Sequence, residues 1–214
     1  MSKLRFEISV SLDGFVAGPE PSTGQPLGAG GEQLHEWALK LASWRESHGR
    51  EGGERSVDDE VMAESWAATA ATIMGRRMFG GGPGPWDETE PWRGWWGDEP
   101  PFAHPVFVLT HHAWEPLSFE NGTEFHFVTE GIEAALERAR EAAGGGDVGL
   151  GGGAEVAQQY LAAGLIDEMQ IHLVPVLLGD GARLFDGLDP AAVKLEQDRV
   201  VEGDQVTHLR YRRA

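Results

Sequence analysis

Cysteine is absent from the chain of 214 residues, which excludes disulfide bonds, thiolate metal sites and a cysteine nucleophile. The chain also lacks any run approaching the ~20 apolar residues that a membrane-spanning helix needs. Its beginning, MSKLRFEISVSLDG, holds no apolar segment long enough for a signal peptide, so we expect a cytoplasmic protein. Basic residues are scarce: 17 lysines and arginines face 35 acidic residues, and the net charge of −18 disfavours nucleic acid and anionic membranes as partners.

The composition that remains, 41% hydrophobic and 24% charged, suits one globular domain over residues 1–214. No internal repeat or linker divides it. Apolar periodicity predicts helices over residues 32–47, 57–68, 132–143 and 154–163. Short apolar runs predict strands over 4–12, 71–74, 106–110, 125–128, 148–150 and 169–174, and a hairpin of 193–202 with 205–212. Strands that alternate with helices before a final hairpin indicate a mainly parallel sheet with an antiparallel edge.

Gly151, Gly152 and Gly153 form the most informative motif, because they join a predicted strand to a predicted helix. Such a turn places bare backbone N–H groups at the positive end of the helix dipole, which favours a phosphate. The same glycines also fit a tight turn that needs positive φ and binds nothing. The string GLGGGA matches G-x-G-x-x-A, but no acidic residue stands about 20 positions later at the end of a second strand, so we discount a Rossmann fold.

Four segments place polar residues or glycines where predicted strands end. Ligands bind at the carboxyl ends of the strands in open α/β sheets, so we expect these segments to converge. They are Asp13–Gly14, Gly75–Arg76–Arg77, Thr110–His111–His112 and the three glycines. Arginine suits phosphate through its planar fork. Two cationic segments beside a glycine turn favour NADPH over NADH, because the 2′-phosphate needs cations of its own.

Residues 80–101 form a long segment rich in glycine, proline and charge that contains Trp86, Trp92, Trp95 and Trp96. Loops of this length are uncommon unless they bind or cover something. One interpretation is a lid that stacks on a flat ring. The other is a surface flap that only covers core, and the sequence leaves both open.

Five strings, in chain order, resemble the dihydrofolate reductase superfamily: SLDGFVAG, MGRRMF, VFVLTHH, GLGGGAEV and IDEMQIHLVPVLLGDGARLF. The closer resemblance, over nearly the whole chain, is to the reductase domain of the bifunctional riboflavin-biosynthesis deaminase–reductase and its stand-alone relatives. The resemblance implies a three-layer α/β/α fold of the dihydrofolate reductase type, NADPH as cofactor, hydride transfer and a homodimer.

The resemblance also implies roles for individual residues. Those that would contact NADPH are Ser9, Val16, Ala17, Gly75, Arg76, Arg77, Thr110, His111, Gly151, Gly152, Gly153, Ala154 and Glu155. The arginine segment would meet the cofactor phosphates, and Thr110 and His111 the 2′-phosphate. The pyrophosphate turn would be Gly152 to Glu155, and the backbone of Ser9, Val16 and Ala17 would meet the nicotinamide. Candidates for substrate contact are Asp13, Glu36 and Trp96, and Asp13 also fits a structural role. No residue is assigned as the proton donor, and no metal is expected.

The sequence departs from the family in two respects. Folate reductases carry an acid early in a helix that pairs with the pterin, and alignment on LHEW places Gln33 there, which cannot share a proton with the ring. The deaminase half is missing, because without cysteine there is no P-C-x-x-C zinc motif. We therefore expect an NADPH-dependent reductase of a small planar heterocycle, of the kind that reduces 5-amino-6-(5-phosphoribosylamino)uracil or a folate-related compound.

Two other functions remain open from the sequence. The chain could bind NADPH without turnover, as the missing acid suggests. A histidine metal site would use residues among His104, His111, His112 and His126. Adjacent side chains on a strand point to opposite faces, which argues against a shared metal ion at His111 and His112.

Overall fold

The computed structural model describes residues 2–22 and 24–214. Its main sheet has the strand order β10-β11-β8-β1-β7-β3-β4-β6-β5. The central strands are parallel: β8 (Glu168–Val174), β1 (Leu4–Ser11), β7 (Asp147–Leu150), β3 (Thr69–Gly75), β4 (Pro105–Leu109) and β6 (Glu124–Val128). The antiparallel additions are β5 (Leu117–Ser118) at one end and β11 (Thr207–Arg213) with β10 (Leu195–Glu202) at the other. A separate ribbon pairs β2 (Phe15–Ala17) with β9 (Ala182–Arg183).

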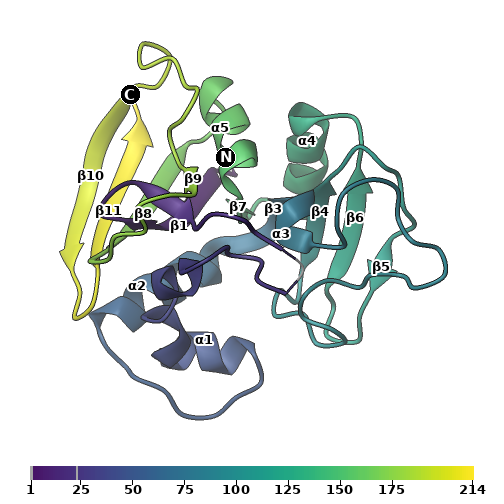
Figure 1. The fold of residues 1–214 in the computed structure, drawn as a ribbon, viewed down its shortest axis with the longest axis horizontal. Helices are drawn as coiled ribbons and strands as arrows, with labels where there is room; N and C mark the ends of the chain where they lie inside the picture. Colours follow the sequence, from purple (N-terminus) through teal and green to yellow (C-terminus); the bar gives the residue numbers. More distant parts are fainter. Residues whose placement is uncertain (1, 23) are drawn as a thin grey trace.

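The helices cover both faces of this sheet, which gives three layers (Figure 1). The helices α4 (Ile132–Ala142) and α5 (Ala154–Ala162) lie on one face, and α1 (Ala42–Ser47) and α2 (Val57–Ala68) on the other. The short helix α3 (Arg76–Phe79) follows β3 directly. Two 3-10 turns, η1 (Gly31–Leu34) and η2 (Ala38–Lys40), precede α1. This is the three-layer α/β/α architecture that the sequence predicted, with its antiparallel carboxyl-terminal edge.

Alternating side chains divide the apolar core between the two faces. Ile73 of β3 packs in the cluster shared with α4 and α5, whereas its neighbour Met74 packs on the opposite face. Two clusters occupy that opposite face. One lies under the 3-10 turns and α2, and the other lies under the tryptophan-containing segment 80–101. A strand alternates its side chains with a period of two, so one run of apolar residues supplies both layers.

Most predicted elements are present with nearly their predicted bounds. The helix α2 begins after Ser56, whose hydroxyl accepts the Asp59 backbone N–H at 3.3 Å, as expected of an N-cap. The hairpin of β10 and β11 turns at Gly203, whose N–H donates to the Val206 carbonyl at 3.0 Å. The apolar run Leu173–Leu178 does not form one element. Its first two residues are the last two of the interior strand β8, and the exposed Leu177 lies beyond that strand.

The predicted helix over 32–47 is wrong, because the chain there is broken into η1, η2 and α1. Leu41 is extended (φ −70°, ψ 147°) and bridges to Glu54. The Glu54 backbone then donates to the Lys40 carbonyl, and its own carbonyl accepts from Ala42. This pairing with a distant segment replaces helical hydrogen bonds, while Leu34, Trp37 and Leu41 still enter one apolar cluster.

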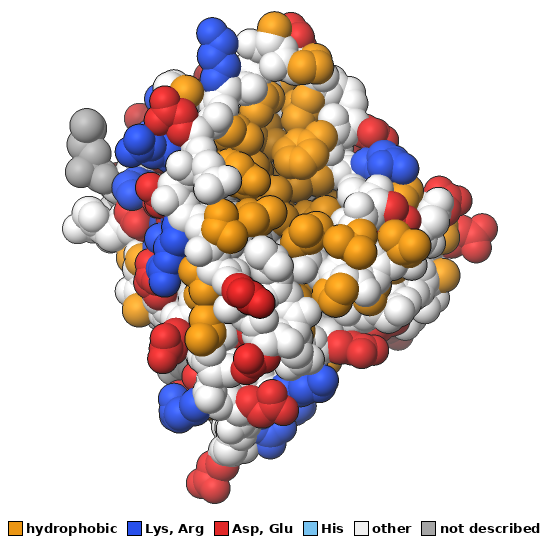
Figure 2. Space-filling model, turned by 90° about the vertical axis from the view of Figure 1, so that its left-hand side faces the viewer, with side chains coloured by type: hydrophobic (Ala, Val, Ile, Leu, Met, Phe, Trp, Pro, Cys, Tyr) orange, Lys and Arg blue, Asp and Glu red, His pale blue; other side chains and the backbone are white. Residues whose placement is uncertain are grey.

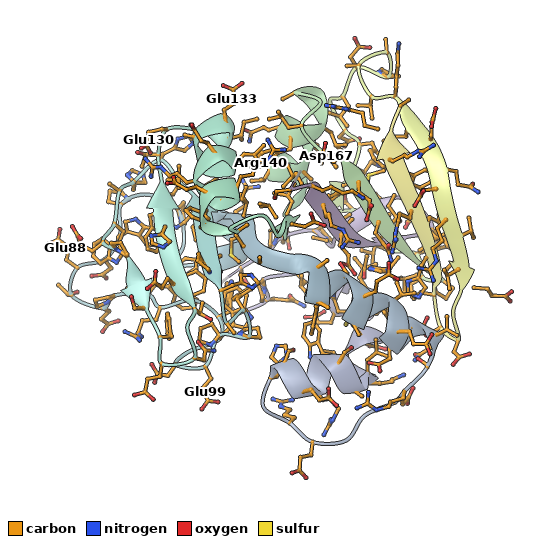
Figure 3. The ribbon with its side chains drawn as sticks, turned by 180° about the vertical axis from the view of Figure 1, so that it is seen from behind. Glu88, Glu99, Glu130, Glu133, Arg140 and Asp167 are labelled. Atoms are coloured by element: carbon orange, nitrogen blue, oxygen red, sulfur yellow. The ribbon has the colours of Figure 1, made fainter. Side chains whose placement is uncertain are left out.

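Ion pairs tie the edge of the sheet where β1 and β8 begin. Arg140 of α4 and Asp167 approach one another (Figure 3), with Nη2 and Oδ2 at 3.5 Å. Asp167 also accepts the Leu4 backbone N–H at 2.8 Å. These contacts fasten α4 at the edge opposite the strand ends discussed below. Across the described ranges, no helix combines the length and the apolar character needed to cross a membrane.

Candidate active site

The carboxyl ends of β1, β7, β3 and β4 meet at one edge of the sheet, because these neighbouring strands are parallel. The chain leaves them through four segments: residues 12–14, 151–153, 76–77 and 110–112. These are the four segments that the sequence predicted to converge. We call this region the carboxyl-end edge.

The glycine turn lies directly against the end of β3. The Gly75 N–H donates to the Gly152 carbonyl at 2.9 Å, and the Gly151 N–H donates to the Ile73 carbonyl at 2.9 Å. A Cβ at Gly75 would lie only 2.7 Å from Cγ2 of Val156 in α5, so only glycine lets the strand and helix approach this closely. At Gly153 the situation is opposite, since a Cβ there would meet no heavy atom of the described residues within 4 Å. The turn is thus closed toward β3 and open at the start of α5.

Arg77 and Glu155 join α3 to the first turn of α5 across this opening. Nη1 of Arg77 and Oε1 of Glu155 are 2.7 Å apart, and the two side chains are 79% and 65% exposed. A guanidinium therefore stands at the N-terminal end of α5, whose dipole also attracts negative charge. No side chain of the described residues caps that helix terminus.

Arg76 points the other way and is occupied by the protein itself. Its guanidinium donates to the carbonyls of Gly80 and Gly81 at 3.1 and 3.3 Å, and to Oγ1 of Thr110 at 3.3 Å. Its Cζ lies 3.1 Å from the centroid of the Trp86 ring, a cation–π contact. Burial lowers the pKa of Arg76 from its ordinary value. The paired arginines thus have different roles: Arg76 holds the start of segment 80–101, and Arg77 faces solvent beside the glycine turn.

Thr110 and His111 follow β4 at the same edge. The Thr110 hydroxyl is buried and also accepts the His112 backbone N–H at 3.2 Å, whereas the His111 side chain is exposed. His111 is therefore the cationic candidate of this segment that can meet a ligand from solvent. The described residues contain no group of three metal-ligating side chains, and the His104 ring contacts Oγ1 of Thr72 at 2.8 Å instead.

The segment after β1 is held by Asp13. Its carboxylate accepts the Ser11 hydroxyl at 2.5 Å and the backbone N–H groups of Leu178 and Gly179 at 3.2 and 2.7 Å. The Ser11 hydrogen bond comes first among the causes that lower the pKa of Asp13 to about 2. Asp13 thus ties the segment after β8 to the end of β1, which is the structural role considered for it.

The remaining predicted residues lie on both sides of β1. Ser9 is buried, and its hydroxyl accepts the Trp37 indole N–H at 3.1 Å. Val16 is buried and Ala17 half-buried in β2, where the Ala17 carbonyl would lie 2.1 Å from a Cβ at Gly181. Glu36 is exposed between the two 3-10 turns.

The tryptophan-containing segment packs on the sheet. Trp86 is buried against Phe79 and Phe127, with ring centroids 5.8 and 4.9 Å away. The Trp96 ring stacks on Phe125 at 6.0 Å with an interplanar angle of 12°. These contacts match the flap that covers core, because the rings already lie against protein. Glu88 and Glu99 project outward from the same segment (Figure 3).

Sequence reasoning missed a buried polar chain beside Ser9 that joins Glu7, His172, His208 and Asp58. The available signal was weak: a single histidine in each of two strand patterns, IHL and THL. The sequence aligned Gln33 with the acid that pairs with the pterin in folate reductases. In the structure Gln33 is exposed in η1. The helix that runs into β3 is α2, and its first turn carries the buried acids Asp58 and Asp59.

The comparisons with known proteins agree with this architecture. The chain matches the RibD C-terminal domain over residues 2–209. The uncharacterized protein YwjB of Bacillus subtilis (strain 168) is 33% identical over 88 residues, which are 41% of this chain and 49% of that protein. The chain thus aligns with about half the length of this curated relative.

Solved structures extend the likeness to the whole chain. A protein from Shewanella sp. PV-4 named for riboflavin biosynthesis has a TM-score of 0.60 at 24% identity, with 100% of this chain and 99% of that one covered. Acinetobacter baumannii RibD has a TM-score of 0.60 at 18% identity, covering 100% and 58%. Dihydrofolate reductase from Enterococcus faecalis, complexed with NADP(H), has a TM-score of 0.51 at 14% identity, covering 99% and 96%. At these identities the likeness shows the fold alone, which is dihydrofolate reductase-like.

Proposed function

The chain belongs to the RibD C-terminal domain family, and from that premise we propose that it is an NADPH-dependent reductase of a small planar heterocycle. The substrate class is that of 5-amino-6-(5-phosphoribosylamino)uracil or a related pterin-like ring. One observation carries the cofactor half of the proposal. The glycine turn opens at Gly153, and Arg77 stands beside it at the start of α5.

The residues at the carboxyl-end edge fit a dinucleotide phosphate. A backbone without side chains can approach at Gly153, the uncapped start of α5 offers N–H groups, and Arg77 offers a guanidinium. Glu155 is the residue that Arg77 must leave, at least in part, to bind a phosphate. The exposed side chain of His111 lies at the end of β4, on the same edge. NADPH, when bound, would supply the hydride.

Other residues hold the segments around the site in place. Asp13 fixes the segment between β1 and β2, where the nicotinamide is expected. Arg76 fixes segment 80–101 to the end of β3 and so holds that side of the site in place. The proposed role of Trp96 in substrate contact requires its ring to present an edge while its face stays on Phe125.

Titration with NADPH and with NADH, followed by quenching of tryptophan fluorescence, tests the cofactor. We expect tighter binding of NADPH, and we expect Arg77→Ala to weaken NADPH about tenfold, or ~1.4 kcal/mol, with a smaller effect on NADH. Arg140→Ala is the matched control, because Arg140 of α4 is 42% exposed and pairs with Asp167 at the opposite edge of the sheet. A preference for NADH, or equal losses in both variants, contradicts the proposal.

An alternative function is NADPH binding without turnover. It is favoured by the state of the acids in the first turn of α2: Asp58 accepts from His208, and Asp59 accepts from the Ser43 backbone at 2.7 Å. Both carboxylates are thus engaged inside the protein. Consumption of NADPH in the presence of dihydrofolate, or of the ribosylaminopyrimidine, separates the two functions.

We also propose that residues 1–214 act as one domain and that two copies form a homodimer through β10. That strand forms an edge of the sheet, and its Leu195 and Val200 are 37% and 50% exposed. Figure 2 shows an extended hydrophobic area on the side of the molecule where β10 and β11 lie. Cytoplasmic location stays a prediction from the sequence.

A further inference from the structure

Four side chains from four elements, three of them buried, form one continuous hydrogen-bonded chain. Oε1 of Glu7 (β1) lies 2.7 Å from Nε2 of His172 (β8), and Nδ1 of His172 lies 2.6 Å from Nδ1 of His208 (β11). Nε2 of His208 lies 2.8 Å from Oδ1 of Asp58 (α2). The two imidazoles therefore face each other through nitrogen atoms of the same kind, each with a carboxylate behind it.

The Glu7 end of this chain is 22% exposed, the other three members are closed to solvent, and Trp37 packs on the two imidazole rings. The side chains of His172, His208 and Asp58 are 3%, 1% and 1% exposed. The Trp37 ring lies 4.7 Å from the His172 ring and 5.6 Å from the His208 ring. Trp37 donates its indole N–H to Oγ of Ser9 at 3.1 Å and to the Leu34 carbonyl at 3.0 Å.

The geometry of the three contacts fits three protons on the four ring nitrogens of His172 and His208. Each carboxylate accepts one N–H, which uses Nε2 of both rings, and the Nδ1···Nδ1 contact needs one proton between the two nitrogens. Three protons on four nitrogens make one imidazole and one imidazolium. A fourth proton would place two N–H groups head to head at 2.6 Å, and with only two protons one of the three contacts would have no proton to share.

Charged groups on every neighbouring element act on this pair. The negative groups are Glu7 and Asp58, and Glu7 also accepts from the Ser65 hydroxyl and lies near Arg5. Directly after η1, burial lowers the pKa of His35 to about 4, and His172 contributes to that shift. Beyond them, Arg210 of β11 pairs with Glu64 of α2 at 3.0 Å and with Glu168 of β8 at 3.7 Å. The two carboxylates favour the third ring proton, which makes one imidazolium. Burial of two adjacent cations opposes the fourth ring proton.

We propose that the His172–His208 pair is a proton-dependent latch that positions Trp37 over Ser9 only while the pair holds three ring protons. The two histidines are positioning residues in this proposal, because they act through Trp37 and contact neither cofactor nor substrate. The proposal bears on the proposed reductase at one point, Ser9, whose backbone is expected to meet the nicotinamide.

The direction with pH follows from the proton count. Burial, followed by the charge of His172, lowers the pKa of His208, so His208 takes up its second ring proton at a pH below the ordinary histidine value of about 6.5. In the unfolded chain both rings take up protons at that ordinary value. Acid therefore favours states in which the rings have separated, and Trp37, packed on both rings, loses its support. At high pH, removal of the proton shared by the two Nδ1 atoms would also break the contact between the rings.

Nuclear magnetic resonance of the histidine ring nitrogens and of the Trp37 indole N–H tests the latch in the full chain. Trp37→Phe identifies the indole signal among the eight tryptophans of the chain. We expect three ring protons on the pair near neutral pH, and an indole signal that shifts when the count changes in acid. In His208→Gln the side-chain amide still donates to Asp58 but does not titrate, so the acid shift of the indole should become smaller. His126→Gln removes a histidine that lies on β6 with its side chain 33% exposed, and it should keep the shift.

A native wild-type protein with two or four ring protons on the pair at neutral pH overturns the proposal, and this result needs no variant that folds. Retention of the full acid shift in His208→Gln overturns it as well. NADPH titrations across the same pH range separate the latch from the proposed function. We expect NADPH to bind more weakly in acid to the wild type and to His126→Gln than to His208→Gln. If NADPH binds at no pH while the indole still follows the ring protons, the latch stands and the reductase assignment fails.

Discussion

At the scale of single residues, Asp13 shows how a carboxylate can organise the site without touching a ligand. Two backbone N–H groups and one hydroxyl converge on it: the hydroxyl belongs to the last residue of β1, and the N–H groups belong to the segment after β8. Asparagine at this position would turn an N–H₂ group toward donors that need an acceptor. We therefore expect Asp13→Asn to lower the urea midpoint of unfolding at pH 7. Asp180→Asn is the control, because among the described residues the Asp180 carboxylate accepts only from the neighbouring Gly181 N–H.

The same carboxylate predicts a pH dependence. Its pKa is about 2 in the folded protein against an ordinary 3.8, so its stabilising contribution is complete above pH 4 and is lost as the pH falls through 2. The difference in urea midpoint between wild type and Asp13→Asn should therefore shrink between pH 4 and pH 2. A constant difference over that range would show that the ionised form of Asp13 is not what stabilises the turn.

At the scale of elements, the close approach of β3 and α5 depends on Gly75. Its φ of −81° suits any residue, so the requirement is for space and not for backbone conformation. In Gly75→Ala the new methyl group meets Val156 at 2.7 Å, and we expect a loss of ~1–3 kcal/mol in the free energy of unfolding. Val156→Ala in the same chain should recover part of that loss, which chemical denaturation of both variants would measure.

Gly153→Ala, in the glycine turn that packs against Gly75, is the matched variant, because its methyl group points into open space. We expect its stability to stay within ~0.5 kcal/mol of wild type. Its NADPH affinity should fall, since the side chain would occupy the place where the phosphate is proposed to approach the backbone. Equal destabilisation of both glycine variants would contradict this view of the turn.

Elements whose helical period or strand alternation matches one buried face were predicted well. The helix α2 and its Ser56 cap, the helices α4 and α5, and the parallel strands all belong to this group. The prediction of a helix over residues 32–47 was wrong although the apolar spacing is helical. Leu41 pairs with Glu54 in a bridge that no local sequence pattern reveals. The convergence of the strand ends was predictable from parallel topology alone, but which arginine faces solvent was not, since that depends on Gly80, Gly81 and Trp86.

The buried chain of histidines was unpredictable for a related reason. His172 and His208 meet because β8 and β11 pair antiparallel in a register that places the two residues opposite each other. A shift of two residues would separate them while leaving the apolar pattern of both strands unchanged. Periodicity therefore identifies the strands but not the contacts between their polar residues.

At the scale of the whole molecule, the charge of −18 is unevenly spread. The last stretch, residues 193–214, contains five basic and four acidic residues, so almost all the excess negative charge lies elsewhere. Two copies that met through most other surfaces would repel each other at low ionic strength. The surface of β10 and β11 is the place where apolar side chains and balanced charge coincide, which is why the proposed dimer uses it.

Sedimentation velocity tests this dimer directly. We expect the wild type to sediment as a dimer at micromolar concentration, and Val200→Asp to shift it toward monomer, because a carboxylate on β10 would be desolvated in the interface. Val57→Asp is the matched control: Val57 is 41% exposed at the start of α2, where an acid also suits the helix dipole. Because the interface carries balanced charge, added salt should strengthen association by screening the rest of the molecule. A wild-type monomer, or equal effects of the two valine variants, would remove β10 as the contact.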